Sequence, residues 1–296
     1  MLDKLTTEMR NQHSMHLDEM STMEILETMN KADEQVLTAI KEQLPQIEKA
    51  AKYAIESFKK NRRLIYVGAG TSGRLGVLDA VECVPTFGTS SEMVQGIIAG
   101  GMKALYEAAE GAEDNPELGA ADLKNIQLSE NDTVIGIAAS GRTPYVIGAL
   151  QYADSKKANT VSISCNKDAV MSQYASVAIE LKTDAEVLTG STRLKAGTAQ
   201  KMVLNMISTA AMVGIGKVYQ NFMVDLKPTN EKLLERSKRN IMEITGADYD
   251  TAASYFEKSH HQVKVAIVMI LLECSYEDAV NRLKNSDGFV RHALIK

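Results

Sequence analysis

The chain has 296 residues, with 33 Lys and Arg against 38 Asp and Glu, for a formal net charge of −5 at pH 7. This length suffices for one α/β domain and a smaller appendage, and the charge, spread without a basic stripe, argues against nucleic acid and membranes as partners. The longest apolar run, 265–272, is far shorter than the ~18 residues of a membrane helix. Three cysteines without a pairing motif, and no recognisable export signal, favour a cytoplasmic location.

The N-terminal part of the chain predicts helices. Residues 1–20 are too polar to build a core alone. Apolar residues at helical spacing predict one amphipathic helix from Ser21 to Leu44, ending at Pro45, and a second from Ile47 to Phe58.

From residue 63 to about 220, predicted strands alternate with helices. The strands are expected at 63–67, 93–99, 133–139, 159–165 and 176–181. Strand, crossover helix and strand again imply an α/β fold, a parallel sheet with helices on both faces. Ligands bind such sheets at the carboxyl ends of the strands.

The last third of the chain is predicted to be helical. The helix beginning near Ala196 is apolar on nearly all sides, as expected of a central helix or of a dimer contact over 202–213. Beyond Asn230, helices over 250–257, 262–274 and 277–284 would make a small three-helix module. We therefore expect three parts: an N-terminal arm with helices (1–60), the α/β domain (61–225) and a C-terminal helical module (226–296).

The first predicted strand is followed by a turn rich in glycine and hydroxyl groups, with Gly70, Thr71, Ser72, Gly73 and Arg74. Its letters also fit the G-x-G-x-x-G dinucleotide fingerprint. However, the acidic residue that should follow about 20 positions on is missing at the end of the next strand. Two hydroxyls, an arginine and helix-start N–H groups suit a phosphomonoester better. The alternative is a tight turn that binds no ligand.

Two further turns repeat this design. Ser140, Gly141, Arg142 and Thr143 follow strand 133–139, and Ser191, Thr192, Arg193 and Lys195 precede the helix at Ala196. Thr143 is a plausible N-cap before Pro144, but capping does not explain why the first two turns both carry Ser-Gly-Arg. Three such turns on one sheet predict a phosphosugar pocket, with Arg74, Arg142, Arg193 and Lys195 as candidate cations.

Two carboxylates are candidates for acid–base chemistry. Glu82 ends the helix that the first turn opens, and Glu113 follows 31 residues later, so only the fold could bring them together. Carboxylates in different environments can divide acid and base roles, although most glutamates in helices face solvent. Cys83 is expected to be a small buried residue rather than a nucleophile. No histidine spacing suggests a metal, and none is expected.

Three segments, 68–79, 136–145 and 189–201, resemble the signatures of the N-acetylmuramic acid 6-phosphate etherases, members of the sugar isomerase domain superfamily. The resemblance extends from Thr7 and Glu8 through 223–225 and 229–233 into the C-terminal helices. It implies a flavodoxin-like three-layer sandwich for the α/β domain and a UBA-like C-terminal module. It also implies a homodimer with the site near the subunit interface.

The resemblance implies a reaction as well. Members of the family cleave the lactyl ether at C3 of the phosphorylated sugar, giving N-acetylglucosamine 6-phosphate and D-lactate by elimination and then hydration, without a cofactor. By resemblance, Glu113 takes the C2 proton, while Glu82 protonates the departing lactate and then activates water. The substrate-binding residues would be Gly70, Thr71, Ser72, Gly73, Arg74, Ser140, Gly141, Arg142, Thr143, Glu186, Ser191, Thr192 and Lys195.

Two rival functions belong to the same superfamily, namely aldose–ketose isomerases and non-catalytic regulators that bind phosphosugars. A regulator would be expected to lose one of Glu82 and Glu113, and an isomerase would not need the motif at 110–114. The chain departs from the family pattern at Asn61-Arg62-Arg63, at Val81 and Val84, and at Asp184-Ala185, which stands where the family has Gly-Pro. None of these departures removes a proposed catalytic group.

Overall fold

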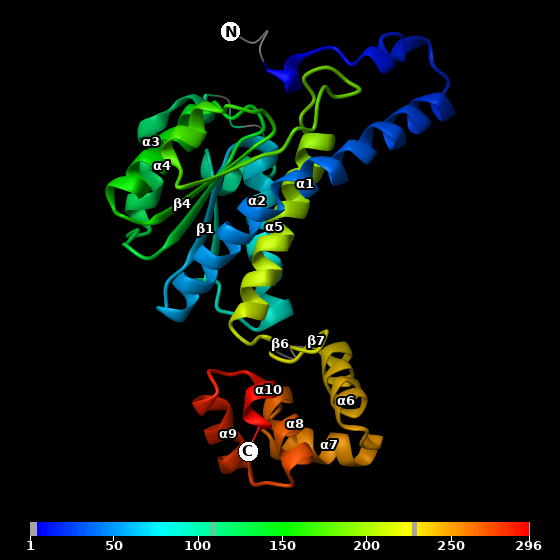
Figure 1. Ribbon diagram of the computed structural model, residues 1–296, viewed down its shortest axis with the longest axis vertical. Helices are drawn as coiled ribbons and strands as arrows, with labels where there is room; N and C mark the ends of the chain where they lie inside the picture. The colour runs from blue at the N-terminus through cyan, green and yellow to red at the C-terminus, as the bar shows by residue number, and fades with distance from the viewer. Residues whose placement is uncertain (1–4, 108, 110, 227–229, 296) are drawn as a thin grey trace. The chain divides into compact units, whose positions relative to one another are not determined.

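The computed structural model describes residues 5–107, 109, 111–226 and 230–295 (Figure 1). Glu110 and Thr229, which belong to two of the motifs above, lie outside these residues. The contacts divide the chain into two compact units, Met1–Val81 with Ser91–Ser208, and Glu82–Ser90 with Thr209–Lys296. Within the described ranges, no helix is long and apolar enough to cross a membrane. The domain boundaries expected from the sequence remain a prediction.

The first unit is built on a five-stranded parallel sheet, which confirms the predicted fold class. The strands are β1 (Leu64–Gly68), β2 (Val94–Ile98), β3 (Thr133–Ile137), β4 (Asn159–Ser164) and β5 (Val177–Glu180). They lie in the order β2-β1-β3-β4-β5, and every neighbouring pair is parallel. This is the flavodoxin-like order, whose direction reverses between β1 and β3 and opens a ligand crevice there.

Helices cover both faces of this sheet (Figure 1). On one side lie α3 (Pro116–Asn125) and α4 (Pro144–Ser155), and on the other lie α1 (Thr22–Lys59), α2 (Gly70–Phe87) and α5 (Lys195–Gly214). Short 3₁₀ turns complete the unit at Thr6–Glu8, Gln12–Ser14, Leu17–Glu19, Gly101–Leu105, Ala112–Asp114 and Val170–Tyr174. The strands β1 and β3 are buried along their whole length, which explains their continuous apolar sequences.

The prediction of two helices, one on either side of Pro45, is wrong, because α1 is one helix with this proline inside it. A proline in a helix interior removes one backbone hydrogen bond and costs about 3 kcal/mol. Buried residues lie on both sides of it, including Val36 and Ile40 before and Ile47 and Ala54 after. Packing along both halves offsets that cost, and α1 continues.

The second unit holds a short hairpin that the sequence did not predict, followed by helices. The hairpin pairs β6 (Val218–Tyr219) with β7 (Phe222–Met223). The helices are α6 (Glu231–Thr245), α7 (Tyr249–Lys258), α8 (Val263–Leu272), α9 (Tyr276–Asn285) and α10 (Val290–Ala293). Caps explain their starts, since Asn230, Asp248 and Ser275 each accept a bond from the third backbone N–H of the helix that follows. The helix α8 is the core of this unit, which accounts for the long apolar run.

Candidate active site

The phosphate turn predicted after β1 forms the start of α2. This helix begins at Gly70, so Thr71, Ser72 and Gly73 lie in its first turn and Arg74 follows at the start of the second. The backbone N–H groups of Thr71 and Ser72 have no acceptor among the described residues. Unpaired N–H groups and the positive end of the helix dipole favour an anion at this position.

The glycines of this turn serve different purposes. Gly70 adopts a left-handed conformation with φ of 52°, and a Cβ there would meet no atom within 4 Å. A Cβ on Gly73 would lie 2.7 Å from the carbonyl oxygen of Gly68 and from Cγ1 of Ile98. Gly73 therefore lets α2 pack closely on the ends of β1 and β2, whereas Gly70 leaves open space.

Two side chains of the turn have protein partners. The buried Ser72 hydroxyl donates to Oε1 of Gln200 on α5 at 2.8 Å. The Nε2 atom of Gln200 is buried and has no hydrogen-bond partner within the described part of the chain. Arg74 donates from Nε to the carbonyl oxygen of Leu105 at 3.2 Å and from Nη2 to that of Glu107 at 3.4 Å. Gln200 was missed as a contact of the turn, although it lies within the third segment of family resemblance.

The structure brings Glu113 to the first turn. A cavity of about 200 Å³ contains both Gly70 and Arg74 of the turn and Glu113 of the 3₁₀ turn Ala112–Asp114. The other described residues that line it are all alanines, at positions 69, 99, 104 and 109. Among the described residues, a small apolar wall with the Glu113 carboxylate, the Arg74 guanidinium and a helix start suits a phosphorylated substrate that must lose a proton.

The second turn begins beside the first, because Gly68 at the end of β1 is paired with Ile137 at the end of β3. Ser140 Oγ accepts a bond from the Arg142 backbone N–H at 3.3 Å, and its own proton has no acceptor among the residues that the structure describes. Thr143 is the N-cap residue of α4, as expected, but its side chain makes no capping bond. The Thr143 hydroxyl is thus not used to cap α4. That Ser140 and Thr143 bind the phosphate group remains a prediction.

The third turn is organised by a buried carboxylate. Glu186 is fully buried and accepts bonds from the backbone N–H groups of Lys195 at 3.1 Å and Ala196 at 2.9 Å, which caps α5. Burial raises the pKa of Glu186, although the two N–H groups and the Lys195 ammonium oppose the shift. Asp184, where the family has glycine, takes a left-handed φ of 57° and so keeps the glycine-like turn.

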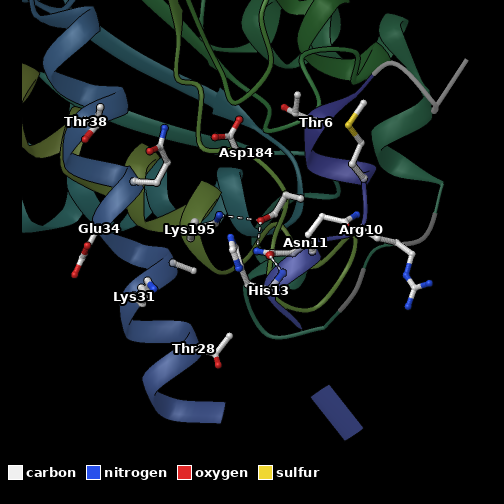
Figure 2. A pocket seen from close by; sticks show the side chains of 15 residues that line it. Thr6, Arg10, Asn11, His13, Thr28, Lys31, Glu34, Thr38, Asp184 and Lys195 are labelled. Carbon is white, nitrogen blue, oxygen red and sulfur yellow. Dashed lines mark hydrogen bonds between the residues drawn. The ribbon is translucent and has the colours of Figure 1, made fainter. Parts of the chain in front are cut away.

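Lys195 lies in a different cavity, of about 930 Å³ (Figure 2). This cavity lies between the N-terminal arm, which supplies Arg10 and Asn11, and α1, which supplies Lys31 and Glu34. The Lys195 ammonium donates to the carbonyl oxygen of Ala185 at 2.8 Å. The role of Lys195 in phosphate binding, like those of Ser191 and Thr192, remains a prediction.

Glu82 is not among the residues that line the cavity of Glu113. It lies twelve residues after Gly70 on α2, and its side chain is exposed. The neighbouring Cys83 is buried, as expected.

Comparisons with known proteins show which proteins the chain resembles. A family model described as the glucokinase regulatory protein N-terminal SIS domain matches residues 46–154, and a SIS domain model matches residues 113–210. The N-acetylmuramic acid 6-phosphate etherase of Shouchella clausii (strain KSM-K16) is 64% identical over 296 residues, covering 100% of both chains. That of Bacillus cereus (strain G9842) is 63% identical over 294 residues, 99% of this chain and 100% of the relative. A solved phosphoheptose isomerase from Francisella tularensis has a TM-score of 0.46 at 12% identity, covering 65% of this chain and 98% of that one.

Proposed function

Since this chain belongs to the family of the N-acetylmuramic acid 6-phosphate etherases, we propose that it cleaves the D-lactyl ether at C3 of N-acetylmuramic acid 6-phosphate. The products are N-acetylglucosamine 6-phosphate and D-lactate, so the enzyme is a carbon–oxygen lyase. The sheet order and the SIS domain match give the sugar isomerase fold. The observation that carries the mechanism is the position of Glu113, in one cavity with the first turn of α2.

The first step needs a base close to the phosphate site. When the sugar ring opens, the aldehyde at C1 makes the proton on C2 acidic. With the phosphate held at the starts of α2 and α4, Glu113 takes this proton, because its carboxylate lines the same cavity as Gly70 and Arg74. Arg74 also holds the segment that leads to Glu113, through the carbonyl groups of Leu105 and Glu107.

The second step breaks the bond between C3 and the ether oxygen. The electron pair left at C2 forms the C2–C3 double bond, and the departing lactate oxygen receives a proton from Glu82. Water then adds to C3 of the unsaturated aldehyde, with Glu82 now acting as the base. A C2 proton returns, and the chemistry closes without an oxidant, a reductant or a cofactor.

We also propose that the enzyme is a homodimer with its site near the subunit interface, that it acts in the cytoplasm, and that its ligand is a small phosphosugar rather than nucleic acid. The absence of a membrane-crossing helix from the described residues is consistent with this environment. The exposed apolar side chains of Leu78 and Val81 on α2 support the dimer.

The direct test is D-lactate release from N-acetylmuramic acid 6-phosphate by the purified chain, measured with a lactate dehydrogenase couple. The unphosphorylated sugar is the control for the phosphate turns, and we expect it to release no lactate at the same concentration. Binding of the phosphorylated substrate without turnover would instead indicate a regulator. Conversion between aldose and ketose phosphates without lactate would indicate an isomerase.

A further inference from the structure

The helix α5 packs against the first turn of α2, at the predicted phosphate site. A Cβ on Gly197 of α5 would lie 3.4 Å from Cγ2 of Thr71, so little space separates the two helices here. Gln200 follows three residues later and lies on the same side of α5. Gln200 is only 1% exposed, and its amide meets the Ser72 hydroxyl, with 2.8 Å between Oε1 and Oγ. Gln200 therefore holds the Ser72 side chain from the side of α5.

The direction of this hydrogen bond is unfavourable for both side chains when an anion binds. A serine hydroxyl has a single proton, and Ser72 gives it to Oε1 of Gln200. The Ser72 oxygen then offers a phosphate group only lone pairs, which repel negative charge. At the same time, Nε2 of Gln200 is buried, and its two protons have no acceptor among the residues that the structure describes. Such donors are rare in protein interiors, because they lose their bonds to water and gain none in return.

A half turn of the Gln200 amide removes both problems. The oxygen and the NH₂ group of an amide have nearly the same shape, so rotation about the last side-chain bond exchanges them in the same space. This torsion is soft, because it joins an sp³ carbon to an sp² carbon. After the rotation, Nε2 donates to Ser72 Oγ, and the Ser72 proton is free to bond a phosphate oxygen. Without an anion the Ser72 proton would lose its acceptor, which favours the observed direction in the free protein.

We infer that Gln200 is a positioning residue of the phosphate site, and that phosphate binding reverses the hydrogen bond between Gln200 and Ser72. In the complex, Nε2 of Gln200 donates to Ser72 Oγ, and the Ser72 hydroxyl donates to a phosphate oxygen. Bonds in such a chain polarise one another, and the charge of the phosphate strengthens the last one. This inference rests on the proposed phosphate site at the start of α2, and it adds the residue that directs the Ser72 proton.

The test is a double-mutant cycle of Ser72→Ala and Gln200→Met. Methionine has about the length of glutamine but has no amide with which to donate to Ser72 or accept from it. Calorimetry measures the Kd of N-acetylglucosamine 6-phosphate, the proposed product, so that no turnover is required. Urea unfolding identifies the variants that fold. Ser208→Ala is the matched control, because it removes a buried hydroxyl from the same helix, bonded to Asp79 at 3.1 Å, and should leave this Kd unchanged.

The expected pattern is that Gln200 matters only while Ser72 is present. Ser72→Ala should raise the Kd roughly 10–100-fold, which corresponds to the loss of one hydrogen bond to a charged group. Gln200→Met should raise it at least about threefold, because nothing then directs the Ser72 proton. The double variant should bind within about twofold of Ser72→Ala. In lactate release, Gln200→Met should raise KM and leave kcat unchanged, because the phosphate is remote from the bonds that break.

NMR of the side-chain amides gives a second measurement. The Gln200 signals are assigned by their loss in Gln200→Met or, if that variant does not fold, in Gln200→Glu. Adding N-acetylglucosamine 6-phosphate should move one Gln200 amide proton downfield in the wild type and neither in Ser72→Ala, because only the wild type can form the reversed bond.

Three results would overturn the inference and leave the proposed function intact. They are an unchanged Gln200 signal in the saturated wild type, an equal effect of Gln200→Met with and without the Ser72 hydroxyl, and a wild-type Kd in Gln200→Met. A wild-type protein that does not bind the phosphosugar would overturn both the inference and the proposed phosphate site.

Discussion

A methyl group added at Gly70 and one added at Gly73 should have different effects, although both glycines belong to the first turn. In Gly73→Ala, the new Cβ would lie 2.7 Å from the Gly68 carbonyl oxygen and from Ile98, a separation that requires α2 to move. In Gly70→Ala, the methyl group meets open space, but at a residue that lines the cavity with Glu113. The first change should act mainly on the fold, and the second mainly on the substrate.

The expected magnitudes follow from these positions. Forcing a methyl group into a packed interior costs typically about 1–3 kcal/mol, and we expect Gly73→Ala to lie at the upper end because backbone opposes it. Gly70 has φ of 52°, and an alanine there costs about 1–2 kcal/mol. Loss of one hydrogen bond to a charged phosphate, about 1.5–3 kcal/mol, corresponds to a fall in kcat/KM of roughly 10–100-fold. We expect this fall in Gly70→Ala.

Urea unfolding and lactate-release kinetics on the same preparations measure both effects. Gly246→Ala is the matched control, because Gly246 has φ of 74° and open space around a Cβ but lies at the end of α6. It should lose about as much stability as Gly70→Ala and keep wild-type kinetics. If Gly70→Ala keeps wild-type kcat/KM, or if Gly73→Ala is no less stable than Gly70→Ala, the assignment of these two roles is refuted.

Two further predictions concern the second turn and the sheet. Ser140→Ala should lower kcat/KM through a weaker substrate complex, by the equivalent of about 1.5–3 kcal/mol if its hydroxyl donates to phosphate, and unchanged kinetic constants would contradict this. Burial raises the pKa of Asp132, but bonds from Arg63 and the Ser129 backbone N–H outweigh burial and hold it below its ordinary value. The stability from Asp132 is thus present above the ordinary aspartate pKa and lost as pH falls below ~4. In Asp132→Asn, the free energy of unfolding, measured with urea, should depend less on pH below ~4. If it falls with pH as steeply as in the wild type, the Asp132 carboxylate is not the cause of the fall.

Much of the fold follows from local sequence patterns. The apolar strands and their glycine turns predicted all five strands of the sheet, because buried parallel strands are continuous apolar runs. Pro45 was misleading, since its local effect is to end a helix, whereas burial on both sides of it in α1 is a property of the whole fold. The hairpin of β6 and β7 was missed because its strands have only two residues each.

The turns of the candidate site follow from the sequence, but the contacts that they make do not. Turns that start helices at strand ends indicate an anion site, and the structure places the first two side by side. The contact between Ser72 and Gln200 joins residues 128 positions apart, and no local pattern encodes it. Likewise, the family resemblance supplied Glu82 and Glu113, but only the structure shows that Glu113 lines one cavity with Gly70 and Arg74.

The central claim is that Glu113 removes the C2 proton and Glu82 protonates the departing lactate. Hydrogen exchange at C2 tests this claim most directly. Wild-type enzyme, Glu82→Gln and Glu113→Gln are each incubated with N-acetylmuramic acid 6-phosphate in deuterated water, and NMR follows the C2 hydrogen together with free lactate. We expect Glu82→Gln to exchange the C2 hydrogen while lactate release falls roughly 10²–10⁴-fold, and Glu113→Gln to lose both. Exchange in Glu113→Gln but not in Glu82→Gln would reverse the two roles, and undiminished lactate release from both variants would contradict the mechanism.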